Sequence, residues 1–135
     1  AAAVVRGIEN AKKKNNKVNG TYSAWFDKGV VEGGAAAYFN GIHPTYDLHA
    51  GESETGFGLM RYPELLDKAQ IASLKPNYEG EFLFERIGAG AKDFIECGAP
   101  DAYFGDPAAA TAENADKQYD VFSDYVVDEV RALLG

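Results

Sequence analysis

Residues 111–134 carry the pattern that most constrains how this chain folds. Apolar side chains recur there in steps of three and four, at Ala115, Tyr119, Phe122, Val126, Val130 and Leu133. This spacing places them on one face of an α-helix. Glu113 near the start and Arg131 near the end complement the helix dipole. The pattern therefore predicts a long amphipathic helix at 111–134.

The rest of the chain alternates between helical and extended patterns. From periodicity and helix breakers we expect helices at 2–14, 31–39 and 54–62, a further turn at 64–68, and strands at 18–26, 81–87 and 94–96. A helix followed directly by a strand is half of an α/β unit, and such units normally need preceding strands to build a sheet. No repeat or low-complexity tract divides the sequence. We therefore expect residues 1–135 to form a single α/β domain.

Composition argues against several classes of function. The net charge of -8 disfavours nucleic acid as a partner, because nucleic-acid binding needs a basic surface. No apolar stretch approaches the roughly 20 residues of a membrane span. The single cysteine, Cys97, cannot form an internal disulfide and fits a reducing compartment. We therefore expect a cytoplasmic protein that binds neither nucleic acid nor membrane.

Residues 47–56 combine an imidazole, glycines and carboxylates just before an apolar helical run. A histidine and an acid at the start of a helix can act together in proton transfer or beside a metal. Amide hydrolysis needs such an acid because the leaving nitrogen departs poorly until it is protonated. His49 and Glu54 are therefore the candidate catalytic residues. Two plainer interpretations stay open, namely a hydrogen-bonded loop histidine and an ordinary acid in the first helical turn.

Three other residues are candidates for contact with a ligand or the site. Gly51 would let the backbone approach a ligand closely because it has no side chain. Trp25, at the end of the strand expected at 18–26, could stack on a flat amide, although a lone tryptophan at a strand end more often packs in a core or rim. His43 lies in a loop, where we expect a solvated side chain.

Four segments of the sequence occur in an order that is specific to one family. They are Trp25-Phe26-Asp27, the run from His49 to Thr55, Tyr62-Pro63-Glu64-Leu65-Leu66-Asp67, and Phe104-Gly105-Asp106-Pro107 with Ala110-Thr111-Ala112-Glu113. They resemble the creatininase family of metal-dependent amidohydrolases, in which an H-[AG]-G-x-x-E-[TS] element closes the active site. The family's E-x-H and N-G-H elements, which carry metal ligands, have no counterpart in this sequence. The chain therefore resembles the C-terminal half of such an enzyme.

This resemblance implies a fold and roles for particular residues. The fold would be a three-layer α-β-α arrangement that here lacks its N-terminal strands, with residues 1–135 forming the C-terminal part of a larger domain. His49 would donate a proton or anchor the substrate, Glu54 would support it, and Trp25 would line the pocket. Glu52 occupies a variable position of the element and is expected to face solvent. Thr45 replaces a tryptophan of creatinine amidohydrolase, which makes it a substrate-binding position and casts doubt on creatinine itself.

The resemblance also implies partners. A divalent metal (Zn, Mn or Fe) is expected in the complete enzyme, with ligands mostly outside this chain, and we assign no metal ligand within it. A preceding segment or a second chain would supply those ligands, and family members tend to form homo-oligomers. The substrate would be a small-molecule amide, creatinine-like or formamide-type.

Three hypotheses remain from the sequence. The chain is part of a metal-dependent amidohydrolase that is inactive without the metal-binding segment. Alternatively, it is a non-catalytic binding or assembly subunit that keeps the fold without the metal site, and the open edge of its sheet would be covered by association. In the third hypothesis it is an α/β domain of unrelated function.

Overall fold

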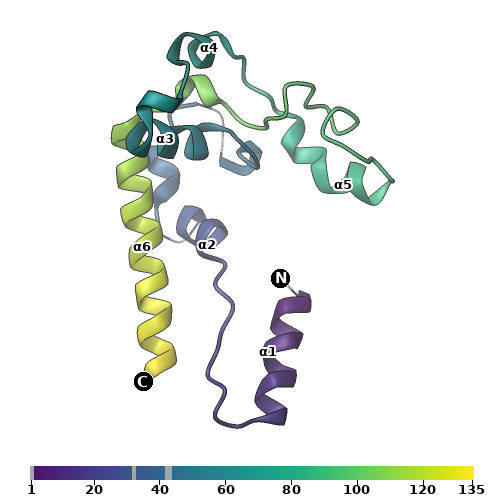
Figure 1. Cartoon of the computed structure of the whole chain (residues 1–135), viewed down its shortest axis with the longest axis vertical. Helices are drawn as coiled ribbons and strands as arrows, with labels where there is room; N and C mark the ends of the chain where they lie inside the picture. Colours follow the sequence, from purple (N-terminus) through teal and green to yellow (C-terminus); the bar gives the residue numbers. More distant parts are fainter. Residues whose placement is uncertain (1, 32, 42–43) are drawn as a thin grey trace. The chain divides into compact units, whose positions relative to one another are not determined.

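The protein is helical throughout the part that the structure describes. A computed structural model describes residues 2–31, 33–41 and 44–135. The α-helices are α1 (Ala2–Lys14), α2 (Trp25–Val31), α3 (Glu52–Arg61), α4 (Lys68–Ser73), α5 (Leu83–Gly88) and α6 (Ala112–Leu134) (Figure 1). Short 3-10 helices connect them: η1 (Ala35–Tyr38), η2 (Pro44–Tyr46), η3 (Pro63–Leu65), η4 (Glu79–Phe82) and η5 (Pro107–Ala109).

The predicted three-layer α/β fold is wrong. The described residues contain no strand, and their only β-type pairings are two isolated antiparallel bridges, His49 with Phe104 and Asn77 with Gly105. The segment expected as a strand at 18–26 is irregular until α2 begins, and the one expected at 81–87 forms the end of η4 and most of α5. Over such short runs, apolar spacing does not distinguish a strand from a helix. A strand also needs a neighbour to take its backbone hydrogen bonds, and none is present among these residues.

The long helices were predicted correctly. α1 covers the range expected for it, α3 begins two residues before the expected start, and α6 begins one residue later than expected. The expected helix at 31–39 is reduced to the four residues of η1, and the turn expected at 64–68 is the 3-10 helix η3. None of the described helices is long and apolar enough to cross a membrane.

The chain divides into two compact units. The first contains Ala1–Gly34 and Asp120–Gly135. Its packing centres on Phe122 of α6, which is only 3% exposed and contacts Trp25 and Phe26 of α2 at ring-centroid distances of 5.1 and 5.4 Å. Gly29 of α2 is required at this contact, because a Cβ there would overlap the Phe122 ring.

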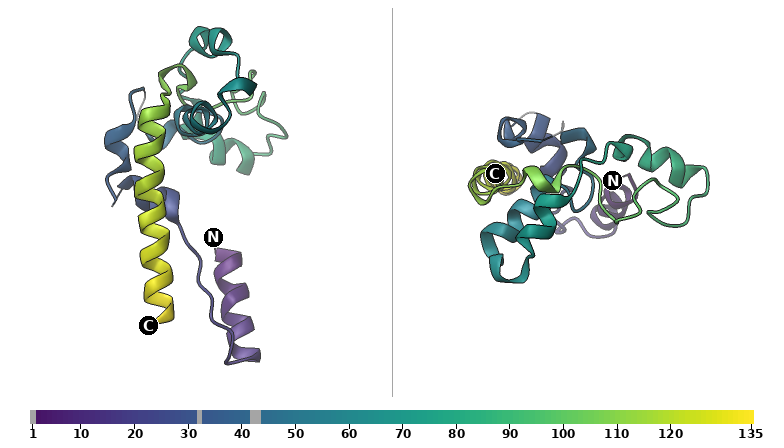
Figure 2. Two further views of the ribbon diagram at one scale, coloured as in Figure 1. Left: turned by 60° about the vertical axis from the view of Figure 1, so that its left-hand side comes forward. Right: turned by 90° about the horizontal axis from the view of Figure 1, so that it is seen from above.

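The second unit, Ala35–Tyr119, contains the motif segment. Phe104 is fully buried and packs with Leu83, Cys97 and Ala99. The start of α6 lies beside α3 (Figure 2), so closely that a Cβ on Gly56 would come within 2.9 Å of the Ala115 methyl group. The bridge between His49 and Phe104 ties the motif segment to this core, since the Phe104 N–H donates to the His49 carbonyl at 2.8 Å.

Candidate functional site

The start of α3 is held by a buried carboxylate. Asp47 is 6% exposed, and its two oxygens accept the backbone N–H groups of Glu52 and Ser53 in the first turn of α3. These donors have no partner within the helix, so the carboxylate satisfies them. Burial raises the pKa of Asp47 to about 6, against the lowering effect of the two N–H donors. Asp47 therefore stabilises the helix start at the cost of a desolvated charge.

Glu52 is also buried, so the prediction that it faces solvent was wrong. It is 3% exposed, and its two oxygens accept the backbone N–H groups of Asn40 at 2.6 Å and Gly41 at 2.7 Å. Burial raises its pKa, and the nearby charge of Asp106 adds to this effect. Glu52 thus ties the segment at 40–41 to the first turn of α3.

Gly51 allows these buried groups to approach the backbone. A Cβ at this position would overlap an Asp47 oxygen and would lie 2.6 Å from the carbonyl oxygen of Phe104. The preceding residue, Ala50, has a positive φ of 47°, which turns the chain into α3. In this structure Gly51 makes room for the protein's own groups, and its predicted approach to a ligand stays a prediction.

The structure brings His49 and Glu54 together on the exposed side of the same segment. His49 Nδ1 lies 3.9 Å from Glu54 Oε2, and the two side chains are 47% and 64% exposed. The separation exceeds a hydrogen bond, so it is a charge contact only when the imidazole is protonated. Glu54 Oε2 also accepts the Ala50 N–H at 2.6 Å, which anchors the carboxylate at the helix start. Both side chains can therefore meet a solute from solvent.

The other predicted site residues lie in different surroundings. Trp25 is the first residue of α2 rather than the end of a strand, is 39% exposed, and belongs to the first compact unit. There its ring packs edge-on against Phe26 and Phe122. Thr45 lies in η2, where it helps to line a groove of about 350 Å³ with Tyr46, Leu48, Gly80, Glu81 and Phe84. His43 lies outside the described residues.

The described residues do not form a complete site for a divalent metal. No group of three or more His, Cys, Asp or Glu side chains with suitable geometry occurs in residues 2–31, 33–41 and 44–135. His49 and Glu54 form only a pair, and the Asp47 and Glu52 carboxylates are engaged by backbone N–H groups. A catalytic zinc site needs three protein ligands, and the described residues alone do not supply them.

Sequence reasoning missed two residues that shape the site. Asp47 was part of the motif segment but received no role, although an acid a few residues before a helix is a familiar capping signal. Phe94 was assigned to a short strand, which is wrong, because the Cys97 N–H bonds back to the Asp93 carbonyl in a helical turn. Its ring instead lies 4.9 Å from the His49 imidazole. No signal in the sequence indicates that Phe94 and His49 are in contact.

Comparison with known proteins gives a single result. Residues 2–130 match the creatininase family, described as creatinine amidohydrolase. The chain belongs to the creatininase family. No curated protein and no solved structure matches it. Membership of the creatininase family indicates an amidohydrolase-like function, in a family whose enzymes are generally metal-dependent.

Proposed function

We propose that this creatininase-family protein takes part in hydrolysing a C–N amide bond of a small molecule, creatinine-like or formamide-type. The observation that carries the proposal is the family match over residues 2–130, in which the histidine and glutamate of the motif face solvent together. A buried and fully engaged pair would have argued against chemistry at this position. The exposed pair can approach an amide directly.

His49 is assigned the proton transfer. Its Nδ1 faces Glu54 Oε2, which leaves Nε2 for the substrate. Once water has added to the carbonyl carbon, the imidazolium N–H donates its proton to the amide nitrogen as the C–N bond breaks, and an amine leaves. Glu54, anchored by the Ala50 N–H, orients the ring. Trp25, Gly51 and Thr45 are proposed as substrate-binding positions.

The groups that activate the attacking water are proposed to come from elsewhere. The divalent metal expected for the complete enzyme (Zn, Mn or Fe) would have its ligands mostly outside this chain, on a preceding segment or a second chain. Intact-mass spectrometry of the purified sample would detect such a companion polypeptide. A closed homo-oligomer and a cytoplasmic location are further proposals of the same kind.

The decisive variant is His49→Ala in the purified assembly. We expect turnover of small amides, measured as released ammonia or amine, to be lost, while metal content measured by elemental analysis stays close to that of the wild type. Glu64→Gln is a matched control, because Glu64 is an exposed acid in η3 outside the site. Equal loss of metal and turnover would make His49 a ligand, and unchanged turnover would contradict the role given to it.

A non-catalytic binding or assembly subunit is the second candidate. The observation that favours it is the lack of a metal-binding group among the described residues. This candidate predicts no amide hydrolysis by the purified wild-type protein and no metal-bearing companion chain. Hydrolysis that depends on His49 would rule it out.

A further inference from the structure

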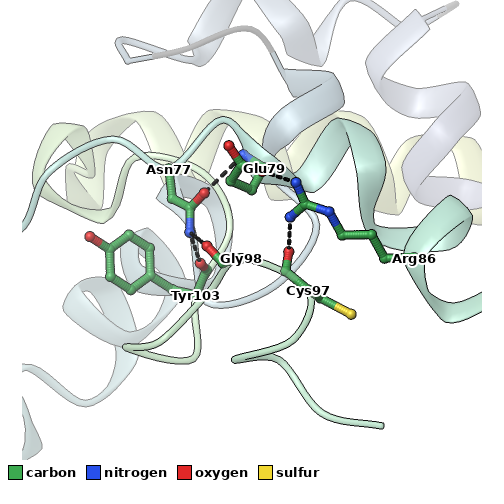
Figure 3. Close-up of polar contacts among 6 residues, drawn as sticks. All are labelled: Asn77, Glu79, Arg86, Cys97, Gly98 and Tyr103. Atoms are coloured by element: carbon green, nitrogen blue, oxygen red, sulfur yellow. Dashed lines mark hydrogen bonds and ion pairs between the residues drawn. The ribbon is translucent and has the colours of Figure 1, made fainter. Parts of the chain in front are cut away.

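The segment between α5 and the bridge at Gly105 has no regular secondary structure, yet it is held from two sides. On one side, Arg86 of α5 donates from Nη1 to the Cys97 carbonyl at 2.5 Å and pairs through Nη2 with Glu79 (Figure 3). Gly98 fits beside this pair with a φ of +87°, and a Cβ there would collide with Arg86 and Glu79. The clamp therefore fixes where the segment passes α5.

Asn77 holds the same segment from the other side. Its side-chain amide donates to the carbonyls of Gly98 at 3.1 Å and Tyr103 at 2.9 Å, as Figure 3 shows. Its backbone forms both hydrogen bonds of the bridge with Gly105, at 2.8 and 3.0 Å. Residues 97–105 are thus fixed by side chains of a neighbouring segment, although they belong to no helix or strand.

Phe94 lies just before this fixed segment and is joined to it, because its carbonyl accepts the Ala99 N–H at 2.7 Å. Its ring packs edge-on against the fully buried Phe104 at a centroid distance of 5.6 Å, and it lies 4.9 Å from the His49 ring, inclined at 48°. Phe104 in turn donates its backbone N–H to the His49 carbonyl. The buried residue Phe104 therefore supports His49 twice: directly, through the hydrogen bond to its main chain, and through Phe94, which contacts its ring.

We infer that Phe94 is a positioning residue for the His49 imidazole, a role whose catalytic meaning rests on the proposed function. His49 is about half exposed, so its ring would otherwise sample several rotamers. The Phe94 ring occupies one side of the imidazole while Glu54 faces Nδ1. The two contacts select one ring orientation before a substrate binds, which lowers the entropy lost in reaching a reactive geometry.

The test is proton NMR of the histidine ring signals, with the His49 signals assigned by their loss in His49→Gln. Phe94→Leu keeps an apolar side chain but removes the ring and its ring current. We expect the His49 ring signals to shift and their nuclear Overhauser contacts to residue 94 to weaken. Ile95→Ala is the matched control, because Ile95 is the next residue and is 67% exposed. The His49 ring signals of Ile95→Ala should match those of the wild type.

In the active assembly, Phe94→Leu should lower kcat by about tenfold with little change in KM, since it loosens orientation rather than binding. His49 signals that are unchanged in Phe94→Leu would overturn the inference, whatever the activity. Should Phe94→Leu fail to fold, the wild-type protein decides: nuclear Overhauser contacts between the His49 and Phe94 rings support the inference, and their absence overturns it. A different result would contradict the proposed function itself, namely unchanged turnover in His49→Ala.

Discussion

Two pairs of side chains alternate along residues 47–54 and have opposite environments. Asp47 and Glu52 are buried, and each carboxylate accepts two backbone N–H groups. His49 and Glu54 are exposed and face each other. In this one short segment the inner pair fixes the path of the chain into α3, and the outer pair, which is proposed for the chemistry, is open to solvent.

The largest effect on the inner side is expected from Gly51→Ala. The new methyl group would overlap the Asp47 carboxylate and approach the Phe104 carbonyl. Asp47 cannot move without breaking its hydrogen bonds to the first turn of α3, and the Phe104 carbonyl shares a peptide plane with the Gly105 N–H, which donates to the Asn77 carbonyl. We expect a loss of about 3 kcal/mol in the free energy of unfolding, measured by urea denaturation. Gly88→Ala is the control, because a Cβ there meets nothing within 4 Å. Equal stability of the two variants would refute the tight inner packing.

The second effect is a dependence of stability on pH. The pKa of Asp47 is raised by burial to about 6 in the folded protein from its ordinary value of 3.8, so the folded state binds the proton more tightly than the unfolded chain. This contribution is fully present below about pH 4 and is lost as the pH rises through about 6, by up to about 3 kcal/mol. Glu52 acts in the same direction.

Urea titrations between pH 4 and pH 7 measure this dependence. Asp47→Asn cannot titrate at this position, so its stability should vary less with pH than that of the wild type. A wild-type profile that rises across the same range would contradict the burial of this carboxylate.

The third prediction compares a buried acid with an exposed one. Glu52→Ala removes a buried carboxylate and leaves the N–H groups of Asn40 and Gly41 without their charged acceptor, which should cost about 2 kcal/mol of stability. Glu64→Ala, at an exposed acid in η3, should cost less than about 0.5 kcal/mol. Thermal denaturation of both variants checks this. Equal melting temperatures for Glu52→Ala and Glu64→Ala would contradict the structural role given to Glu52.

The smallest effect concerns the exposed side, where substrate selection is proposed. Thr45→Trp would place an aromatic ring at the groove lined by Leu48 and Phe84. If this position contacts substrate, a planar ring substrate such as creatinine should gain several-fold in kcat/KM over formamide, about 1 kcal/mol of stacking. Kinetics on both substrates measure the ratio. If the ratio of kcat/KM for creatinine to that for formamide equals the wild-type ratio, position 45 does not contact the substrate.

Much of the helical structure was predicted correctly, and the three predicted strands were wrong. α1 and α6 carry apolar residues at helical spacing over many turns, and Pro63 follows the end of α3, the helix that begins within the motif. The segments at 18–26 and 81–87 are too short for their spacing to decide between helix and strand. The preference of such segments is set by whether another strand lies beside them.

The candidate site was likewise predicted only in part. The motif at 49–55 identified His49 and Glu54 and placed the chain in its family, and their proximity follows from a separation of five residues at a helix start. The inward turn of Glu52 could not be predicted, because it depends on the positive φ of Ala50 and on the N–H groups of residues 40–41. The contact between His49 and Phe94 joins positions far apart in the sequence.

The amino-acid sequence alone determined the family, the long helices and the two residues proposed for proton transfer, because these depend on local spacing and on residue type. Only the tertiary structure decided which acids are buried, which aromatic ring lies against the imidazole, and that the described residues pair in isolated bridges rather than a sheet. These depend on contacts between distant segments, whose energies outweigh the weak preferences of short stretches.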